Sequence, residues 1–256
     1  MEGICYLNIV PEEIRKYIIF LTEHKVFDLC LVNKYFNNNC KIIKIVSNFD
    51  YLKYYSKLTD INLKELINLT SLNLYRNNTI TDEGIKDLIN LNSIDLFYNN
   101  KITNDGLKSL INITSLNLCE NEIITDEGIK SLTNLTFLNL NANYKITDDG
   151  IRGLITLNSL NLSFNTKITN DGIKRLINLN SLILYYNNVI SDEGIKGLIS
   201  LSSLDLCNNK IITDKGIKEL TNLTFLNLSH YCSNNKITDE GIKRLPNLKN
   251  LYNNNK

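Results

Sequence analysis

The sequence predicts an α/β repeat fold in which each repeat supplies one short strand and one short helical turn, preceded by a small all-α segment. Aliphatic residues recur every 22 positions in a series that runs from Leu72 to Leu226. Eight of the 11 Gly fall at a single place within this period. A fixed period of this length indicates stacked units, because one repeat cannot bury its own apolar face.

The first half of each repeat reads LxxLxLxxN and predicts the strand. In the first copy Leu69, Leu72 and Leu74 occupy the aliphatic places. Alternation of this kind turns both strand leucines to one side and leaves the residue between them on the other. The strands are therefore expected to cover one side of the stack and to present a row of polar side chains outward.

The second half of each repeat reads ITDEGIKxLxN and changes to helical spacing. Ile80, Ile85 and Leu88 can point inward together from a short helical turn that Thr81 caps. The acids of the phrase suit the positive end of the turn, and a lysine follows, so we expect a solvated outer face of mixed charge. The repeated Gly are expected to let neighbouring turns approach closely.

The Asn that closes LxxLxLxxN is predicted to be buried and structural. Its amide can satisfy backbone groups of its own turn and the adjacent one, which would form a ladder through the stack. The last repeat is three residues longer, so Asn234 is expected to take the ladder place there, with residues 229–233 bulging at the rim. The ladder positions are Asn77, Asn99, Asn121, Asn143, Asn165, Asn187 and Asn209.

These phrases resemble the leucine-rich repeat family, over residues 69–247. The resemblance implies a curved solenoid with a parallel sheet on its concave side and short helices on its convex side. We divide this part into a degenerate capping repeat over 47–68, eight repeats over 69–247 and a truncated repeat over 248–256. Such scaffolds bind other proteins, so the resemblance implies a binding function.

Residues 1–46 lack the repeat and show helical spacing. The phrase Val10-Pro11-Glu12-Glu13-Ile14 and the later phrase Leu31-Val32-Asn33-Lys34-Tyr35-Phe36 resemble an F-box, although Phe36 stands where that family commonly has Trp. The resemblance implies docking to the adaptor of an SCF-type ubiquitin ligase. The alternative is a helical cap over the first turn of the solenoid. The matching adaptor contacts are Pro11, Ile14, Leu31 and Val32.

Composition and charge narrow the functional classes. The formal net charge is +1, so no overall field attracts nucleic acid or an anionic membrane. The chain has 42 Asn, one Ala and two His, so a histidine-based metal or acid–base site is not expected. The excess of Asn, Ile, Lys and Tyr is typical of AT-rich genomes, and F-box and repeat proteins of this composition resemble those of large DNA viruses of amoebae.

The start of the chain has no secretory pattern, and no apolar stretch is long enough to span a bilayer. The six cysteines form no CxxC pair and are irregularly spaced. We therefore expect an intracellular, cytoplasmic protein (host cytoplasm if viral) rather than a secreted adhesion protein. The same features are compatible with a nuclear location. Sequons at Asn68, Asn112, Asn134 and Asn222 are interpreted as structural parts of the repeat.

Two aromatic groups stand at exposed positions of the strands, and such residues anchor protein interfaces. The alternative is that they only cover neighbouring strands. A further aromatic, Phe137, stands in an otherwise Ser-rich column. The expected target-binding residues are Tyr75, Arg76, Phe97, Tyr98, Phe137, Phe164, Tyr185 and Tyr186.

An enzymatic function is not expected. The repeated Gly are one per turn and form no phosphate-binding loop, and we predict no catalytic residue, metal, cofactor or small-molecule substrate. Cys119 and Cys207 fall among the exposed columns but lack a local base. The leading hypothesis is a substrate-recognition subunit of an SCF-type ubiquitin ligase that binds an unknown target protein on the concave face. The second is a stand-alone repeat module with a helical cap.

Overall fold

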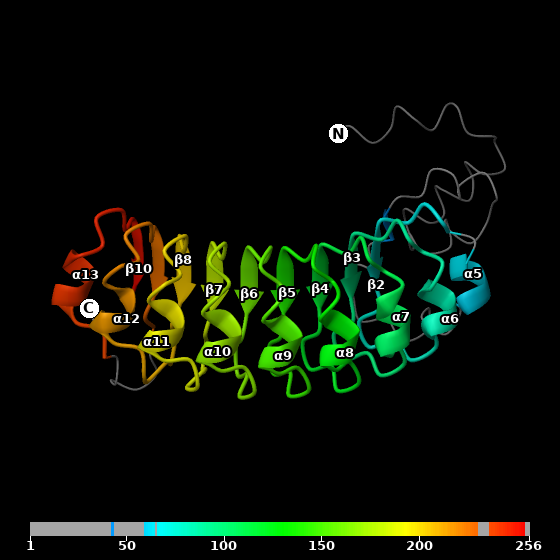
Figure 1. Ribbon diagram of the computed structural model, residues 1–256, viewed down its shortest axis with the longest axis horizontal. Helices are drawn as coiled ribbons and strands as arrows, with labels where there is room; N and C mark the ends of the chain where they lie inside the picture. The colour runs from blue at the N-terminus through cyan, green and yellow to red at the C-terminus, as the bar shows by residue number, and fades with distance from the viewer. Residues whose placement is uncertain (1–41, 44–58, 65, 230–235, 254–256) are drawn as a thin grey trace, which may run out of the picture.

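The computed structural model describes residues 42–43, 59–64, 66–229 and 236–253, which form one parallel solenoid (Figure 1). The described strands make a 10-stranded sheet whose strand order follows the sequence. Helices lie along the opposite side of the coil (Figure 1). The α/β solenoid predicted from the 22-residue period is confirmed.

The strands are short because only the LxL part of each phrase is extended. Their bounds are β1 (Ile42–Ile43), β2 (Ser71–Asn73), β3 (Ser93–Asp95), β4 (Ser115–Asn117), β5 (Phe137–Asn139), β6 (Ser159–Asn161), β7 (Ser181–Ile183), β8 (Ser203–Asp205), β9 (Phe225–Asn227) and β10 (Asn250–Tyr252). From β2 to β9 neighbouring strands pair at steps of 22 residues, as between Leu116 and Leu138. The first step is 29, since Ile43 of β1 pairs with Leu72 of β2. The last step is 25, since Leu226 pairs with Leu251, which confirms the longer repeat.

The helices are single turns. Their bounds are α5 (Asp60–Lys64), α6 (Asp82–Ile85), α7 (Asn104–Lys108), α8 (Asp126–Ile129), α9 (Asp148–Ile151), α10 (Asn170–Ile173), α11 (Asp192–Ile195), α12 (Asp214–Ile217) and α13 (Asp239–Lys243). Thr81 caps α6 as predicted, because its hydroxyl accepts the Glu83 N–H at 3.3 Å. Helices this short depend on packing against the stack for their stability.

The core is a continuous column of aliphatic side chains along the inside of the coil. The three leucine places of the strand phrase and the three aliphatic places of the helical phrase are buried, as Leu138, Leu140 and Ile151 illustrate at 0% exposure. The exception is Ile242 in the last repeat, which is partly buried. Burial of one such side chain contributes roughly 1.5–3 kcal/mol before chain entropy is subtracted. The six aliphatic positions per repeat predicted to point inward are confirmed.

The predicted asparagine ladder is present inside the stack. Asn143 is 0% exposed, and its amide nitrogen donates to the carbonyls of Leu118 and Asn121, both at 3.0 Å. Its amide oxygen accepts the N–H groups of Lys145 and Ile146, both at 3.0 Å. The same pattern recurs at Asn99, Asn121, Asn165 and Asn187, so the ladder ties each repeat to the one before it.

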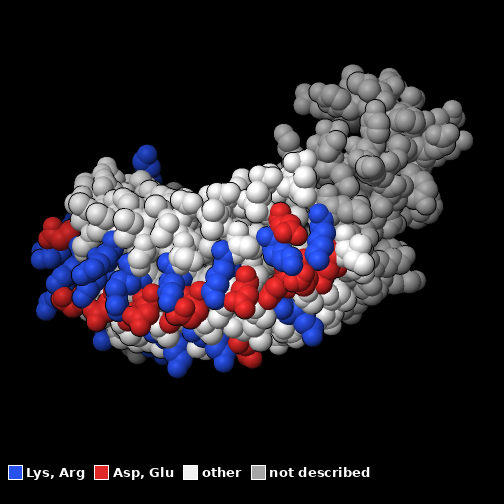
Figure 2. All heavy atoms as spheres, turned by 45° about the vertical axis from the view of Figure 1, so that its right-hand side comes forward, with Lys and Arg blue, Asp and Glu red and all other residues white. Residues whose placement is uncertain are grey.

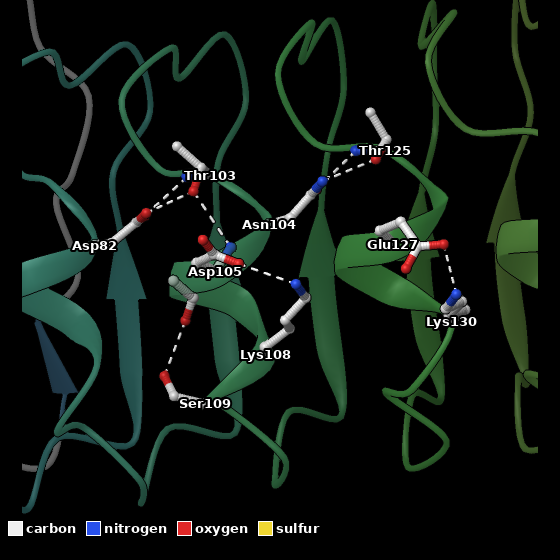
Figure 3. Close-up of polar contacts among 10 residues, drawn as sticks. Asp82, Thr103, Asn104, Asp105, Lys108, Ser109, Thr125, Glu127 and Lys130 are labelled. Atoms are coloured by element: carbon white, nitrogen blue, oxygen red, sulfur yellow. Dashed lines mark hydrogen bonds and ion pairs between the residues drawn. The ribbon is translucent and has the colours of Figure 1, made fainter.

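A second ladder runs along the helices and corrects the expectation of a purely solvated outer face. The Asp82 carboxylate accepts the Thr103 N–H at 2.8 Å and the Thr103 hydroxyl at 2.6 Å (Figure 3). In the next repeat Asn104 makes the equivalent contacts to Thr125 at 3.0 and 2.8 Å. From α5 to α12 the first residue of the helical turn therefore joins consecutive repeats, while later residues of the phrase such as Glu83 and Lys86 face water.

Those outer residues form the mixed-charge surface that the sequence predicts. Lys130 and Glu127 form an exposed ion pair, as do Lys108 and Asp105 at 2.9 Å (Figure 3). Figure 2 shows Lys, Arg, Asp and Glu gathered in one band along the helices. Exposed pairs of this kind contribute little to stability, since solvent screens them.

A third set of contacts holds the turns that lead back into the strands. The Asn112 amide donates to the Ile89 carbonyl at 2.9 Å, and the Asn134 amide donates to the Ile111 carbonyl at 3.1 Å. Asn222 makes the same bond to Ile199 at 2.9 Å. These three sequon asparagines therefore have the structural role that we predicted.

Several predictions concern positions outside the described residues. These are the proposed adaptor contacts Pro11, Ile14, Leu31 and Val32, the ladder place of Asn234, and the bulge with His230, Tyr231 and Cys232. Among the residues that the structure does describe, no helix has the length and apolar character needed to cross a membrane.

Candidate protein-binding surface

The row between the strand leucines is half-buried, and its polar side chains fix the ends of β2 to β9 except β7, where Ile183 occupies the place. The Asn117 side-chain oxygen accepts the Cys119 N–H at 3.0 Å, and an Asp95 carboxylate oxygen accepts the Phe97 N–H at 2.9 Å. Burial raises the pKa of Asp95. The sequence predicts an exposed row here; instead these side-chain oxygens accept hydrogen bonds and position the second residue after the strand.

The residue just before each ladder Asn has a left-handed backbone. Values of φ between 48° and 55° occur at Arg76, Tyr98, Glu120, Ala142, Phe164, Tyr186 and Asn208. Bulky side chains rarely adopt this conformation. It is held here by hydrogen bonds between repeats, such as that from the Phe164 N–H to the Tyr185 carbonyl at 2.9 Å. The side chains of these residues therefore extend from a backbone of fixed conformation.

One aromatic group lies over β2 and β3, and we call it the first cluster: Tyr75, Arg76, Phe97 and Tyr98. The Tyr75 and Phe97 ring centroids are 4.8 Å apart. The Arg76 guanidinium carbon lies 5.3 Å from the Tyr75 ring centroid and 5.1 Å from that of Tyr98. Tyr98 is 52% exposed. The structure thus brings all four predicted residues together and leaves one ring largely open to solvent.

A second cluster lies over β6 and β7 and consists of Phe164, Tyr185 and Tyr186. Phe164 stacks on Tyr186 with ring centroids 5.1 Å apart and planes 10° apart. Tyr185 meets the edges of both rings at 5.0 and 4.9 Å. Phe164 is 41% exposed and Tyr186 is 39% exposed. The rings hold one another in place and still present apolar area outward.

Phe137 is 39% exposed on β5, in register with Ser115 and Ser159 of the neighbouring strands. We expected it to be the exception in that column, but Phe225 occupies the same column on β9. Phe225 packs against Tyr252 with ring centroids 5.5 Å apart, so a third aromatic contact was missed. Counting the 22-residue steps as far as β9 would have found Phe225.

This face carries few charges. In β2 to β10 and the described positions up to three residues after each of them, the charged residues are Arg76, Asp95, Glu120 and Asp205. The charged side chains of the helices lie in the band seen in Figure 2. A partner on the strand side therefore meets mainly aromatic, hydroxyl and amide groups, so apolar contact and hydrogen bonds would contribute more than ion pairs.

Neither Cys119 nor Cys207 offers an activated nucleophile. Cys119 is buried at 4% exposure, which corrects its placement among exposed residues, and burial raises its pKa to about 11. Cys207 is half-buried, and burial also raises its pKa. Both thiols are therefore protonated near neutral pH. Within the residues that the structure covers, no group of three or more His, Cys, Asp and Glu side chains is arranged to hold a metal ion.

Comparison with known proteins agrees with this architecture. A family model described as "Leucine Rich repeat" matches eight consecutive segments: residues 65–89, 87–111, 109–132, 131–155, 153–177, 175–199, 197–221 and 219–245. Among curated protein sequences, none matches this chain.

Two solved structures from Listeria monocytogenes are similar. The internalin C2 structure has a TM-score of 0.59 and 30% sequence identity, and the match covers 77% of this chain and 84% of the internalin. The internalin InlF structure has a TM-score of 0.56 and 27% identity, with 76% of this chain and 62% of the other covered. The chain thus spans most of the first protein and less than two thirds of the second.

Proposed function

Because the chain belongs to the leucine-rich repeat family, we propose that this protein-interaction scaffold binds a target protein across its strand side. We further propose that it presents this target as the substrate-recognition subunit of an SCF-type ubiquitin ligase. The solenoid supplies proximity and orientation and leaves the chemistry to the ligase.

The observation that carries target binding is the pair of ordered aromatic clusters on one face. Protein interfaces draw most of their affinity from a few aromatic and arginine side chains. Tyr98, Phe164 and Tyr186 are partly exposed, and hydrogen bonds between repeats hold the backbone at each of them in a left-handed conformation. Groups fixed before binding lose less entropy in the complex. Phe137, on the strand next to β6, extends this surface toward the first cluster.

The proposed link to the ligase rests on the sequence near residues 10–36. Pro11, Ile14, Leu31 and Val32 match the positions at which the F-box family contacts its adaptor. An F-box followed by leucine-rich repeats is also a known family combination, and this chain has its two segments in that order. These residues are the proposed adaptor contacts.

Binding of the full chain to the purified adaptor tests this link. We expect retention of the adaptor at micromolar concentrations, and loss of retention in Leu31→Asp. Tyr98→Ala serves as the matched control, because it alters only the strand face and should bind the adaptor normally. If the folded wild-type chain does not retain the adaptor, the ligase role is wrong while target binding is unaffected.

Target recognition is tested by comparing cluster variants for binding to the target captured with the full chain. We expect Tyr98→Ala and Phe164→Ala each to weaken binding by roughly 30-fold or more, the effect of losing an interface anchor. Tyr144→Ala is the control, since Tyr144 is 49% exposed but belongs to neither cluster. Equal affinity in all three variants would contradict the proposed surface.

A stand-alone repeat module is the second candidate. It is favoured by one observation: among the residues that the structure describes, the aromatic side chains of this surface contact one another within the repeats. Deleting residues 1–46 distinguishes the two candidates. If that segment is an F-box, the shortened chain keeps its fold and its target; if it is a cap, the first turns unfold.

A further inference from the structure

A row of exposed isoleucines runs along the turns between the helices and the strands. We call it the isoleucine row: Ile67, Ile89, Ile111, Ile155, Ile177 and Ile199, which are 54, 57, 63, 56, 56 and 57% exposed. Each one follows a core residue directly, as Ile89 follows the buried Leu88. Thr133 occupies the place between the third and fourth isoleucine, and Thr221 the place after the last. The row is separate from the aromatic clusters and plays no part in the function proposed above.

The turns that carry the row are locked together. The Asn90 amide donates to the Ile67 carbonyl at 2.9 Å, and the Asn178 amide donates to the Ile155 carbonyl at 2.9 Å. At the centre Thr156 bonds to the Thr133 carbonyl at 2.6 Å. Consecutive isoleucines therefore follow one another repeat by repeat and form a rigid apolar line on each side of Thr133.

The isoleucines are not needed for the fold at these positions. Thr133 and Thr221 stand at the same place in other repeats, which shows that the turn accepts a polar residue. Large apolar side chains exposed one after another on a protein surface commonly mark a place that another molecule covers. The apolar line therefore indicates an interface.

The order of residues along the row identifies the occupant. Read from either end, the seven places from 67 to 199 give three isoleucines, one threonine and three isoleucines. A two-fold contact brings the same patch of two copies together. With the axis crossing the row at Thr133, Ile89 meets Ile177 of the second copy, and Ile111 meets Ile155 of the second copy.

One pair of charges beside the row agrees with this axis. Asp87 and Arg175 stand two residues before Ile89 and Ile177, and both are exposed. A two-fold axis at Thr133 places Asp87 of one copy opposite Arg175 of the other copy. The contact would thus contain the Asp87–Arg175 pair twice. The equivalent places in the middle of the row hold Ser109, Ser131 and Gly153, which are small enough to let the two rows approach. Complementary charges of this kind set the register of an interface.

We propose that two copies of the chain associate through their isoleucine rows in an antiparallel, two-fold dimer, with Asp87 of each copy facing Arg175 of the other. The dimer leaves the strand side of both copies free.

Sedimentation equilibrium of the full chain tests the association. We expect a monomer–dimer equilibrium, and a dissociation constant raised at least about tenfold in Ile89→Lys, because each substitution occurs twice in the dimer. Ile123→Lys is the matched control, since Ile123 is 37% exposed and lies outside the row. A wild-type chain that stays monomeric at near-millimolar concentration, or an equal effect of both substitutions, would overturn the proposal.

Two further variants test the register. Asp87→Arg should weaken the dimer about tenfold, and adding Arg175→Asp should restore it. Under mild oxidation Thr133→Cys should give a cross-linked dimer well above the wild-type background, whereas Ile89→Cys should not, unless Ile177→Cys is present as well. Cross-linking of Ile89→Cys with itself would mean a parallel contact and would contradict the antiparallel arrangement.

Discussion

Replacing Gly194 with alanine is expected to destabilise the solenoid by about 2 kcal/mol, although alanine favours helices over glycine by about 1 kcal/mol. A Cβ atom at this position would lie 2.5 Å from the Asn170 side-chain oxygen and 3.0 Å from the Ile190 Cγ2 atom. Neither neighbour can move without loss, so the extra atom strains the contact between two repeats.

The cost comes from the ladder along the helices. Asn170 accepts the Ser191 N–H at 2.9 Å and donates to the Ser191 hydroxyl at 2.8 Å. A side chain at position 194 would push Asn170 away and break both bonds, each of which contributes about 1 kcal/mol. The repeated glycines therefore make room for the side chain of the preceding repeat. Because φ at Gly194 is not positive, an unusual backbone conformation is not the reason.

Gly197 provides the matched control within the same repeat. A Cβ atom there meets no atom within 4 Å, so Gly197→Ala should be neutral or stabilise by up to about 1 kcal/mol. In a double-mutant cycle, Asn170→Ala should remove most of the steric part of the Gly194→Ala effect. Denaturant unfolding of the four variants measures these differences. Equal stability of Gly194→Ala and Gly197→Ala would show that the close approach of position 194 to Asn170 does not affect the free energy of unfolding.

The core and the inner ladder were predictable because the residues of both recur at every 22-residue step. Leu72 and its equivalents recur at one place, and a strictly repeated Asn after a strand has few roles apart from pairing the backbone. The helix ladder was harder to foresee. Asp82 looks like a residue that favours a helix start, and only the link between Asp82, Thr103 and Gly106 across 24 residues shows that it joins two repeats.

The two aromatic clusters were predictable in membership but not in conformation. The 22-residue register placed Tyr98 beside Arg76, and Phe164 beside Tyr186, without any coordinates. A left-handed backbone is normally indicated by glycine or asparagine, and only Asn208 in that row follows the rule. Hydrogen bonds between repeats impose the conformation at Tyr98 and Phe164, so the residue types there carry no sign of it.

The inner ladder should give the largest single effect of a side-chain truncation. Asn99→Ala is expected to destabilise the protein by about 3–5 kcal/mol, because it leaves the Asn77 carbonyl and the Ile102 N–H buried without partners. It also removes one of the two hydrogen bonds to the Leu74 carbonyl. Asn100→Ala, at the adjacent exposed position, should change stability by less than about 0.5 kcal/mol. Chemical denaturation with both variants checks this, and similar losses at the two sites would refute the ladder's role.

Asn99→Asp separates hydrogen bonding from packing, because it keeps the shape and replaces the donating NH2 with an acceptor. The carboxylate that this substitution introduces would be buried beside the Leu74 and Asn77 carbonyls, so its pKa in the folded state should rise above the unfolded value of about 3.9. The variant should therefore be least stable at neutral pH and regain stability as the pH falls through the raised pKa, where a protonated carboxyl can donate again. Asn99→Ala should show no such recovery relative to the wild type. Parallel pH profiles of unfolding for the two variants would contradict this account of the ladder, since a packing defect alone does not titrate.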